Sequence, residues 1–185
     1  PRIGAAPEIA LILGSGLGGL AAAVEDPIFL SYEDIPGFPV STAPGHAVRF
    51  VLGWLGGRRV VMMQGRVHLY EGWSAQDIAL PVRLMRKMGA HTLIVTNAAG
   101  ALDPALKPGA PMLIEDHLNL TGVNPLTGPN DDALGPRFPD MSRAYDPDLR
   151  ALTLAAAQEV NEDLPSGIYC GIAGPSLETS AERRW

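Results

Sequence analysis

Three short apolar runs, each ending at glycine or other small residues, constrain the fold of this chain more than any other feature. They cover residues 8–13, 91–96 and 168–173, and they lead into the sequences GSGLGG, NAAG and GP. A short apolar run bounded by turn residues indicates a buried strand. We therefore expect a sheet whose strands end in tight turns.

Helical segments and one hairpin complete the expected elements. Residues 77–88 and 148–160 carry apolar residues at helical spacing, and Asp77 is expected to cap the first helix before it ends at Gly89. Residues 49–55 and 58–64 flank Gly56-Gly57, which predicts an antiparallel hairpin. A short helix is expected after residue 19 and a short strand at 111–114. Residues 121–147, rich in Gly, Pro, Asn and Asp, predict a functional loop.

This alternation of strands and helices predicts the α/β fold class. We expect a single domain over residues 1–185, in which helices flank a central mixed β-sheet. The net charge of -6 includes no block of like charges, which argues against nucleic acid or an anionic membrane as a partner. A single cysteine, Cys170, and the absence of an apolar run of roughly 20 residues predict a soluble, cytoplasmic protein.

The GSGLGG sequence at residues 14–19 matches the G-x-G-x-x-G spacing of dinucleotide sites, which is a weak signal alone. A dinucleotide site also needs a second parallel strand that ends in an acidic residue, but here Glu33-Asp34 enters a turn-rich loop. We favour a glycine turn whose amides, with the Ser15 hydroxyl, face a single phosphate. A purely structural tight turn is the alternative.

The sequence RVHLYEG at residues 66–72 follows the second hairpin strand. In an extended backbone Arg66, His68 and Tyr70 project to one side. The arginine fork matches phosphate oxygens, and a neighbouring histidine can donate a further hydrogen bond. The alternative is an edge strand whose polar face meets water.

Three further candidates have equally ordinary alternatives. Asn97 and Ala98 end a strand with small residues that let a ligand approach, or they form a packed turn. Glu178 can accept hydrogen bonds from a heterocycle, or it stabilises the first turn of a helix. His46 is an isolated loop histidine that is expected to face solvent unless other residues implicate it.

These blocks, in this order, resemble the trimeric, low-molecular-mass purine nucleoside phosphorylases. The resemblance covers nearly the whole chain and rests on these sequences: GSGLG at residue 14, STAPGH at 41, MMQGRVHLYEG at 62, VTNAAG at 95, DHLNL at 116, NPLTGPN at 124, RFP at 137 and GPSLET at 174. Many motifs in register are far more specific than any one of them.

The resemblance implies a set of roles. Phosphate would be held by Ser15, Arg66, His68 and the Ala98 amide, with His46 nearby. Ribose would contact Tyr70, with Phe138 closing the site of a neighbouring subunit in a homotrimer. The purine would contact Glu178, Leu177 and Ala98, and the residues implied in catalysis are His68, Glu178 and Asn97. Inorganic phosphate would be a co-substrate, and neither a metal nor an organic cofactor is expected.

Two departures from the family and two rival functions remain. Leu177 stands where many relatives carry an aromatic residue, which implies weaker stacking on the base. The family also continues well past Glu182, so this chain resembles a truncated member. The rivals are a methylthioadenosine phosphorylase and a non-catalytic chain that retains phosphate or purine binding; Glu178 and the segment 70–72 resemble the 6-oxopurine enzymes instead.

Overall fold

The computed structural model describes residues 5–40 and 48–184, whose contacts divide the chain into two compact units. Unit 1 consists of Pro1–Ala99 with Asn124–Thr127, and unit 2 of Gly100–Val123 with Gly128–Trp185. A five-stranded sheet lies in unit 1 and a two-stranded sheet in unit 2. The expected α/β class is confirmed, and the single domain stays a prediction.

The sheet of unit 1 is mixed, as expected, with the strand order β2-β3-β4-β1-β5. β1 (Ile9–Leu13) pairs in parallel with β4 (Arg58–Gln64) on one side and with β5 (Thr92–Val95) on the other. β3 (Arg49–Leu55) pairs antiparallel with β4 and with β2 (Glu25–Ser31). The predicted hairpin is confirmed with the bounds expected from the sequence.

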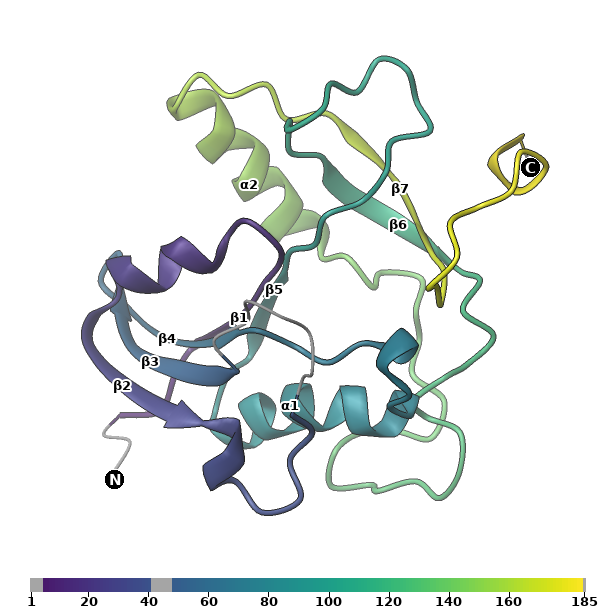
Figure 1. Ribbon diagram of the computed structural model, residues 1–185. Helices are drawn as coiled ribbons and strands as arrows, with labels where there is room; N and C mark the ends of the chain where they lie inside the picture. The colour runs from purple at the N-terminus through teal and green to yellow at the C-terminus, as the bar shows by residue number, and fades with distance from the viewer. Residues whose placement is uncertain (1–4, 41–47, 185) are drawn as a thin grey trace. The chain divides into compact units, whose positions relative to one another are not determined.

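Both faces of this sheet are covered, which explains why its central strands are apolar nearly throughout. On one face, Ile12, Phe50 and Met63 pack with Met85 of α1 (Ala75–Lys87). On the other face, Leu11 and Met62 pack with Ala21 of the 3₁₀ helix η1 (Gly18–Ala23). Figure 1 shows α1 and η1 on opposite sides of the sheet.

The helix α1 begins one turn earlier than the sequence predicted. Its N-cap is Ser74, whose Oγ accepts from the Asp77 amide at 3.1 Å, while the Asp77 carboxylate accepts from the Ser74 amide at 3.1 Å. The expectation that Asp77 is the cap was therefore wrong, because Asp77 is the reciprocal partner in a capping box. Gln76 donates to the Thr127 carbonyl at 2.9 Å and so ties Asn124–Thr127 to this helix.

Two strands of unit 1 differ from expectation. β2 was not predicted, since Pro27 and the acidic start of the segment weaken its strand pattern. β5 was expected to be buried, but Leu93, Ile94 and Val95 are 42%, 46% and 52% exposed. The expectation was wrong because β5 pairs with β1 alone, at the edge of the sheet.

The described part of unit 2 contains a parallel pair of strands and one α-helix. β6 (Leu113–Asn119) extends further than the predicted strand, and it pairs with β7 (Ser166–Gly171). The helix α2 (Pro147–Glu159) begins after Asp146, whose carboxylate accepts from the amide of Leu149 at 3.0 Å. An ion pair of 3.0 Å between Arg150 and Glu115 ties α2 to β6.

The predicted long loop is present in unit 2. No helix or strand occurs between residues 121 and 146, all of which the structure describes. Three short 3₁₀ helices complete the elements: η2 (Tyr32–Asp34) and η3 (Leu69–Glu71) in unit 1, and η4 (Glu182–Arg184) in unit 2. Among the helices of the described residues, none has both the length and the apolar character that crossing a membrane requires.

Candidate active site

The candidate site of unit 1 lies where three parallel strands end side by side. β1 lies between β4 and β5, so that Leu13 pairs with Gln64 and Ile12 pairs with Val95. Ser15 follows β1, Arg66 follows β4, and Asn97 and Ala98 follow β5. Ligands of α/β proteins bind at this carboxyl edge of parallel strands. The strand order thus brings the predicted phosphate ligands of unit 1 to one edge.

Gly14 is where the ends of β1 and β5 come into closest contact. Its amide donates to Thr96 Oγ1 at 2.8 Å, and the Thr96 hydroxyl donates to the Ile12 carbonyl at 2.9 Å. A Cβ at Gly14 would lie 2.7 Å from both Asn97 Cα and the Thr96 carbonyl oxygen, which is too close for any larger residue. Glycine is required at position 14 because the backbone there packs directly against the backbone of Thr96 and Asn97.

The glycine turn after β1 leaves Ser15 exposed. The Leu17 amide donates to the Gly14 carbonyl at 3.1 Å, and η1 begins at Gly18. The dinucleotide alternative does not fit this arrangement, because β2 pairs antiparallel with β3 and has no parallel partner beside β1. The turn geometry therefore leaves the single-anion and purely structural interpretations.

Gln64, at the end of β4, holds the start of η1 in place. Its Oε1 accepts from Arg49 Nε at 2.8 Å, and its Nε2 donates to the Gly18 carbonyl at 3.0 Å. Because arginine has only donors, this network fixes which way the amide of Gln64 points. The side chain thus links the hairpin to the turn that carries Ser15.

Arg66 is held across the end of β5. Its Nη1 donates to the Thr96 carbonyl at 2.7 Å, and its Nε donates to His68 Nε2 at 3.4 Å. A guanidinium presents its donors in a planar fork whose geometry matches the oxygens of an anion such as phosphate.

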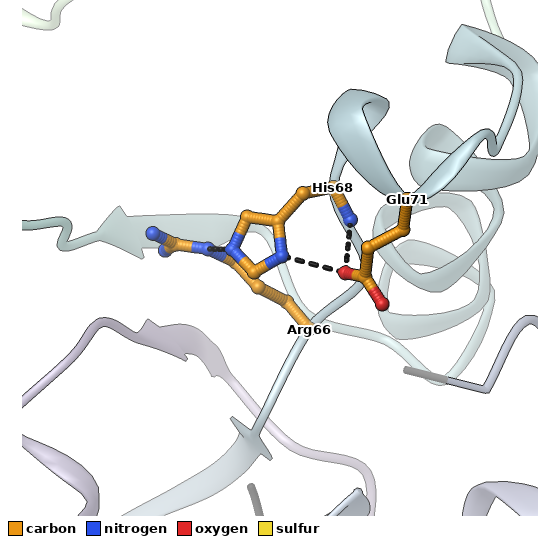
Figure 2. Close-up of polar contacts among 3 residues, drawn as sticks. All are labelled: Arg66, His68 and Glu71. Carbon is orange, nitrogen blue, oxygen red and sulfur yellow. Dashed lines mark hydrogen bonds and ion pairs between the residues drawn. The ribbon is translucent and has the colours of Figure 1, made fainter. Parts of the chain in front are cut away.

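The His68 ring is oriented by a nearly buried carboxylate (Figure 2). Glu71 Oε1 accepts from the His68 backbone amide at 2.9 Å and lies 2.7 Å from Nδ1, and the Glu71 side chain is only 3% exposed. Since a carboxylate is an acceptor, this contact assigns a proton to Nδ1 and turns Nε2 toward Arg66. Glu71 therefore determines which ring nitrogen faces Arg66.

Tyr70 extends this row of side chains. Its ring stacks on that of His68 with a centroid distance of 4.8 Å and an interplanar angle of 17°, and Tyr70 is 51% exposed. Val67, by contrast, is buried. The expected extended backbone holds as far as His68 and then gives way to η3. Arg66, His68 and Tyr70 nevertheless follow one another in contact, as the alternation predicted.

Asn97 and Ala98 complete the edge in unit 1. Asn97 Nδ2 donates to the Ala98 carbonyl at 3.1 Å, and Ala98 is exposed. Among the described residues, no group of three or more His, Cys, Asp or Glu side chains is placed to hold a metal ion.

The remaining predicted residues belong to unit 2 or fall outside the described residues. Phe138 and Leu177 of unit 2 are 87% and 86% exposed, Glu178 is also exposed, and the Arg137 guanidinium lies 5.6 Å from the centre of the Phe138 ring. His46 lies outside the described residues. The ribose and purine roles of these residues stay predictions.

Sequence reasoning missed three side chains that organise this edge: Gln64, Glu71 and Thr96. Glu71 stands three residues after His68, the spacing of a capping box, so that pattern could have indicated the contact. Thr96 and Gln64 act through partners 82 and 46 residues away, for which no local pattern exists.

Comparisons with known proteins show which family this chain resembles. The family model described as "Phosphorylase superfamily" matches residues 8–185. Purine nucleoside phosphorylase 1 of Bacillus subtilis is 52% identical over 97% of this chain and 66% of its own length. The purine nucleoside phosphorylase of Mus musculus is 50% identical over 96% of this chain and 63% of its own length.

A solved structure is similar over the same extent. Isoform 2 of purine nucleoside phosphorylase from Schistosoma mansoni, in complex with cytosine and ribose-1-phosphate, superimposes with a TM-score of 0.90 and 45% identity, covering 96% of this chain and 64% of that one. The chain thus spans about two thirds of the length of the curated relatives it matches. On the family match and these identities, the chain belongs to the phosphorylase superfamily.

Proposed function

We propose that the complete protein containing this chain cleaves purine nucleosides of the inosine and guanosine type with inorganic phosphate, in purine salvage. The products are the free purine and ribose 1-phosphate. The names of the relatives support the reaction, and the Schistosoma mansoni structure contains ribose-1-phosphate. The observation that carries the proposal is the contact of Arg66 with both Thr96 and His68 at the shared edge of β4, β1 and β5.

The proposed phosphate site uses donors from all three strand ends. Ser15 supplies a hydroxyl, Arg66 a guanidinium fork, and the backbone of Ala98 an amide, while His46 lies near the anion. His68 Nε2, which in the structure accepts from Arg66 Nε, would instead accept from a protonated phosphate oxygen when the anion is bound. Glu71 contacts Nδ1 and so leaves Nε2 as the ring nitrogen for this role.

The reaction forms a bond from a phosphate oxygen to C1' of the ribose and breaks the bond from C1' to the purine nitrogen. Positive charge develops on the sugar and negative charge on the base as this bond breaks. The bound anion stabilises the sugar and is oriented to capture C1'. The electron pair leaves with the purine, which takes up a proton.

The remaining residues have roles on the nucleoside. Tyr70, stacked on His68, contacts the ribose. Glu178 accepts from the N–H groups of a 6-oxopurine, Leu177 and Ala98 contact the base, and Asn97 lies beside the reacting centre. Phosphate is itself the nucleophile, so the proposed reaction requires no organic cofactor and no metal.

We also propose that the protein is a cytoplasmic homotrimer in which Phe138 closes the site of a neighbouring subunit. An aromatic side chain that is 87% exposed supports this role, since such residues are enriched at protein interfaces. A single, exposed cysteine is in keeping with a reducing compartment. Light scattering on the complete protein tests the assembly, and a monomer would contradict it.

Phosphate-dependent turnover tests the proposed reaction. The complete protein is incubated with inosine, with and without phosphate, and hypoxanthine and ribose 1-phosphate are quantified. Formation of both products in equal amounts, only with phosphate and undiminished by a metal chelator, is expected. A preference for methylthioadenosine over inosine would instead identify the protein as a methylthioadenosine phosphorylase. Phosphate binding in a calorimeter without turnover would make it a binding protein.

A further inference from the structure

The buried hydroxyl of Tyr32 contacts the backbone immediately before Arg66. Tyr32 is 1% exposed, and its hydroxyl donates to the Gly65 carbonyl at 2.8 Å, across 33 residues of sequence. This carbonyl belongs to the peptide that joins Gly65 to Arg66. The hydroxyl therefore holds the peptide plane from which the Arg66 side chain departs.

The packing around Tyr32 does not by itself require a hydroxyl. The ring lies 4.7 Å from that of Phe38 and 5.0 Å from that of Phe50, in tilted and edge-on arrangements, within the cluster on the α1 face of the sheet. A phenylalanine would keep these ring contacts, whereas a buried hydroxyl costs free energy unless it is hydrogen-bonded. What the hydroxyl adds to this cluster is the bond to Gly65.

Gly65 is the point at which the chain leaves β4. It is buried and has a φ of +96°, a conformation that other residues rarely adopt. Immediately after it, Arg66 reaches Thr96 and His68 at distances of 2.7 and 3.4 Å. A rotation of the Gly65–Arg66 peptide would move the guanidinium away from the Thr96 carbonyl, which lies on another strand end.

We propose that Tyr32 is a positioning residue for phosphate recognition, which acts through the Gly65–Arg66 peptide on the guanidinium of Arg66. The inference rests on the proposed function, because it assigns Arg66 to phosphate. Tyr32 is buried against the backbone at Gly65, so it does not contact the substrate directly. Its loss therefore affects the binding of phosphate and leaves the binding of nucleoside intact.

The test is the KM for each substrate in Tyr32→Phe of the complete protein. Loss of one buried hydrogen bond predicts a KM for phosphate that rises about five- to tenfold, with the KM for inosine unchanged. Phe38→Leu is the matched control: it removes a ring from the same cluster but keeps the Gly65 bond, so it should lower the melting temperature without changing the KM for phosphate. A general loosening of the cluster would affect both variants alike.

A second variant perturbs the same peptide directly, at Gly65. Gly65→Ala strains the positive φ and should also raise the KM for phosphate selectively, even if Tyr32→Phe does not fold. The inference is overturned if the recovered variants have a wild-type KM for phosphate, or if Phe38→Leu raises it equally. Absence of phosphorolysis in the wild-type protein would instead overturn the proposed function, and this inference with it.

Discussion

Replacing Gly14 with alanine tests whether the ends of β1 and β5 must touch for the site to form. The added Cβ would lie 2.7 Å from Asn97 Cα, 2.7 Å from the Thr96 carbonyl oxygen and 2.9 Å from the Thr96 carbonyl carbon. All three are backbone atoms, so no side-chain rotation relieves the clash. The strands must separate, which weakens the bond from the Gly14 amide to Thr96 Oγ1.

The size of the effect follows from two opposing terms. Overpacking of a close contact costs about 1–3 kcal/mol. Alanine also lowers the conformational entropy of the unfolded chain, which stabilises the folded protein by about 0.4–1 kcal/mol. The net loss of about 1–2 kcal/mol corresponds to a fall in melting temperature of about 2–8 °C for a domain of 150–250 residues. Because Thr96 also accepts from Arg66, we expect the KM for phosphate to rise.

Gly19→Ala provides the matched control in the same segment. A Cβ at Gly19 meets no atom within 4 Å, so this variant should melt at or slightly above the temperature of the wild-type protein. Calorimetry and phosphate kinetics on both variants complete the assay. The reasoning is refuted if Gly14→Ala melts like the wild type with an unchanged KM, or if Gly19→Ala loses as much stability.

Three further variants test individual side chains. Arg66→Ala should raise the KM for phosphate about 10- to 150-fold, the equivalent of a charge-assisted hydrogen bond of about 1.5–3 kcal/mol; an unchanged phosphate dependence would contradict the assignment. Glu178→Ala should lower kcat/KM for inosine and guanosine together, and intact turnover would make Glu178 structural. Gln64→Glu keeps the bond to Arg49 but presents a carboxylate to the Gly18 carbonyl. The KM for phosphate should rise about fivefold, and wild-type kinetics would show that the link to η1 is dispensable.

The elements that the sequence predicted well are those determined by local patterns. The hairpin β3–β4 follows from two strand-like runs around Gly56-Gly57, and the helix α1 follows from its apolar spacing. The error over Asp77 is local too, since Ser74 and Asp77 form a reciprocal pair and either residue fits a cap.

Burial was harder to predict because it depends on what covers a strand. The strands β1 and β5 are both mainly apolar, yet β1 is central and β5 lies at the sheet edge with three exposed side chains. Nothing in a short apolar run distinguishes these two positions. Strand order depends on the whole chain, so it cannot be predicted from the sequence of a single strand.

The candidate site was predictable as a set of residue types but not as an arrangement. The alternation in residues 66–70 correctly grouped Arg66, His68 and Tyr70. Glu71, which orients His68, is only three residues away, but Thr96, whose carbonyl holds Arg66, is 30 residues away. A partner as distant as Thr96 becomes visible only when the parallel order of β4, β1 and β5 is known.

A crystal structure of the complete protein with phosphate tests the central claim most directly. The account predicts one phosphate at the carboxyl edge of β4, β1 and β5, within hydrogen-bond distance of the Ser15 hydroxyl, the Arg66 guanidinium and His68 Nε2. A phosphate bound elsewhere, with these three side chains directed away from a common ligand, would contradict it.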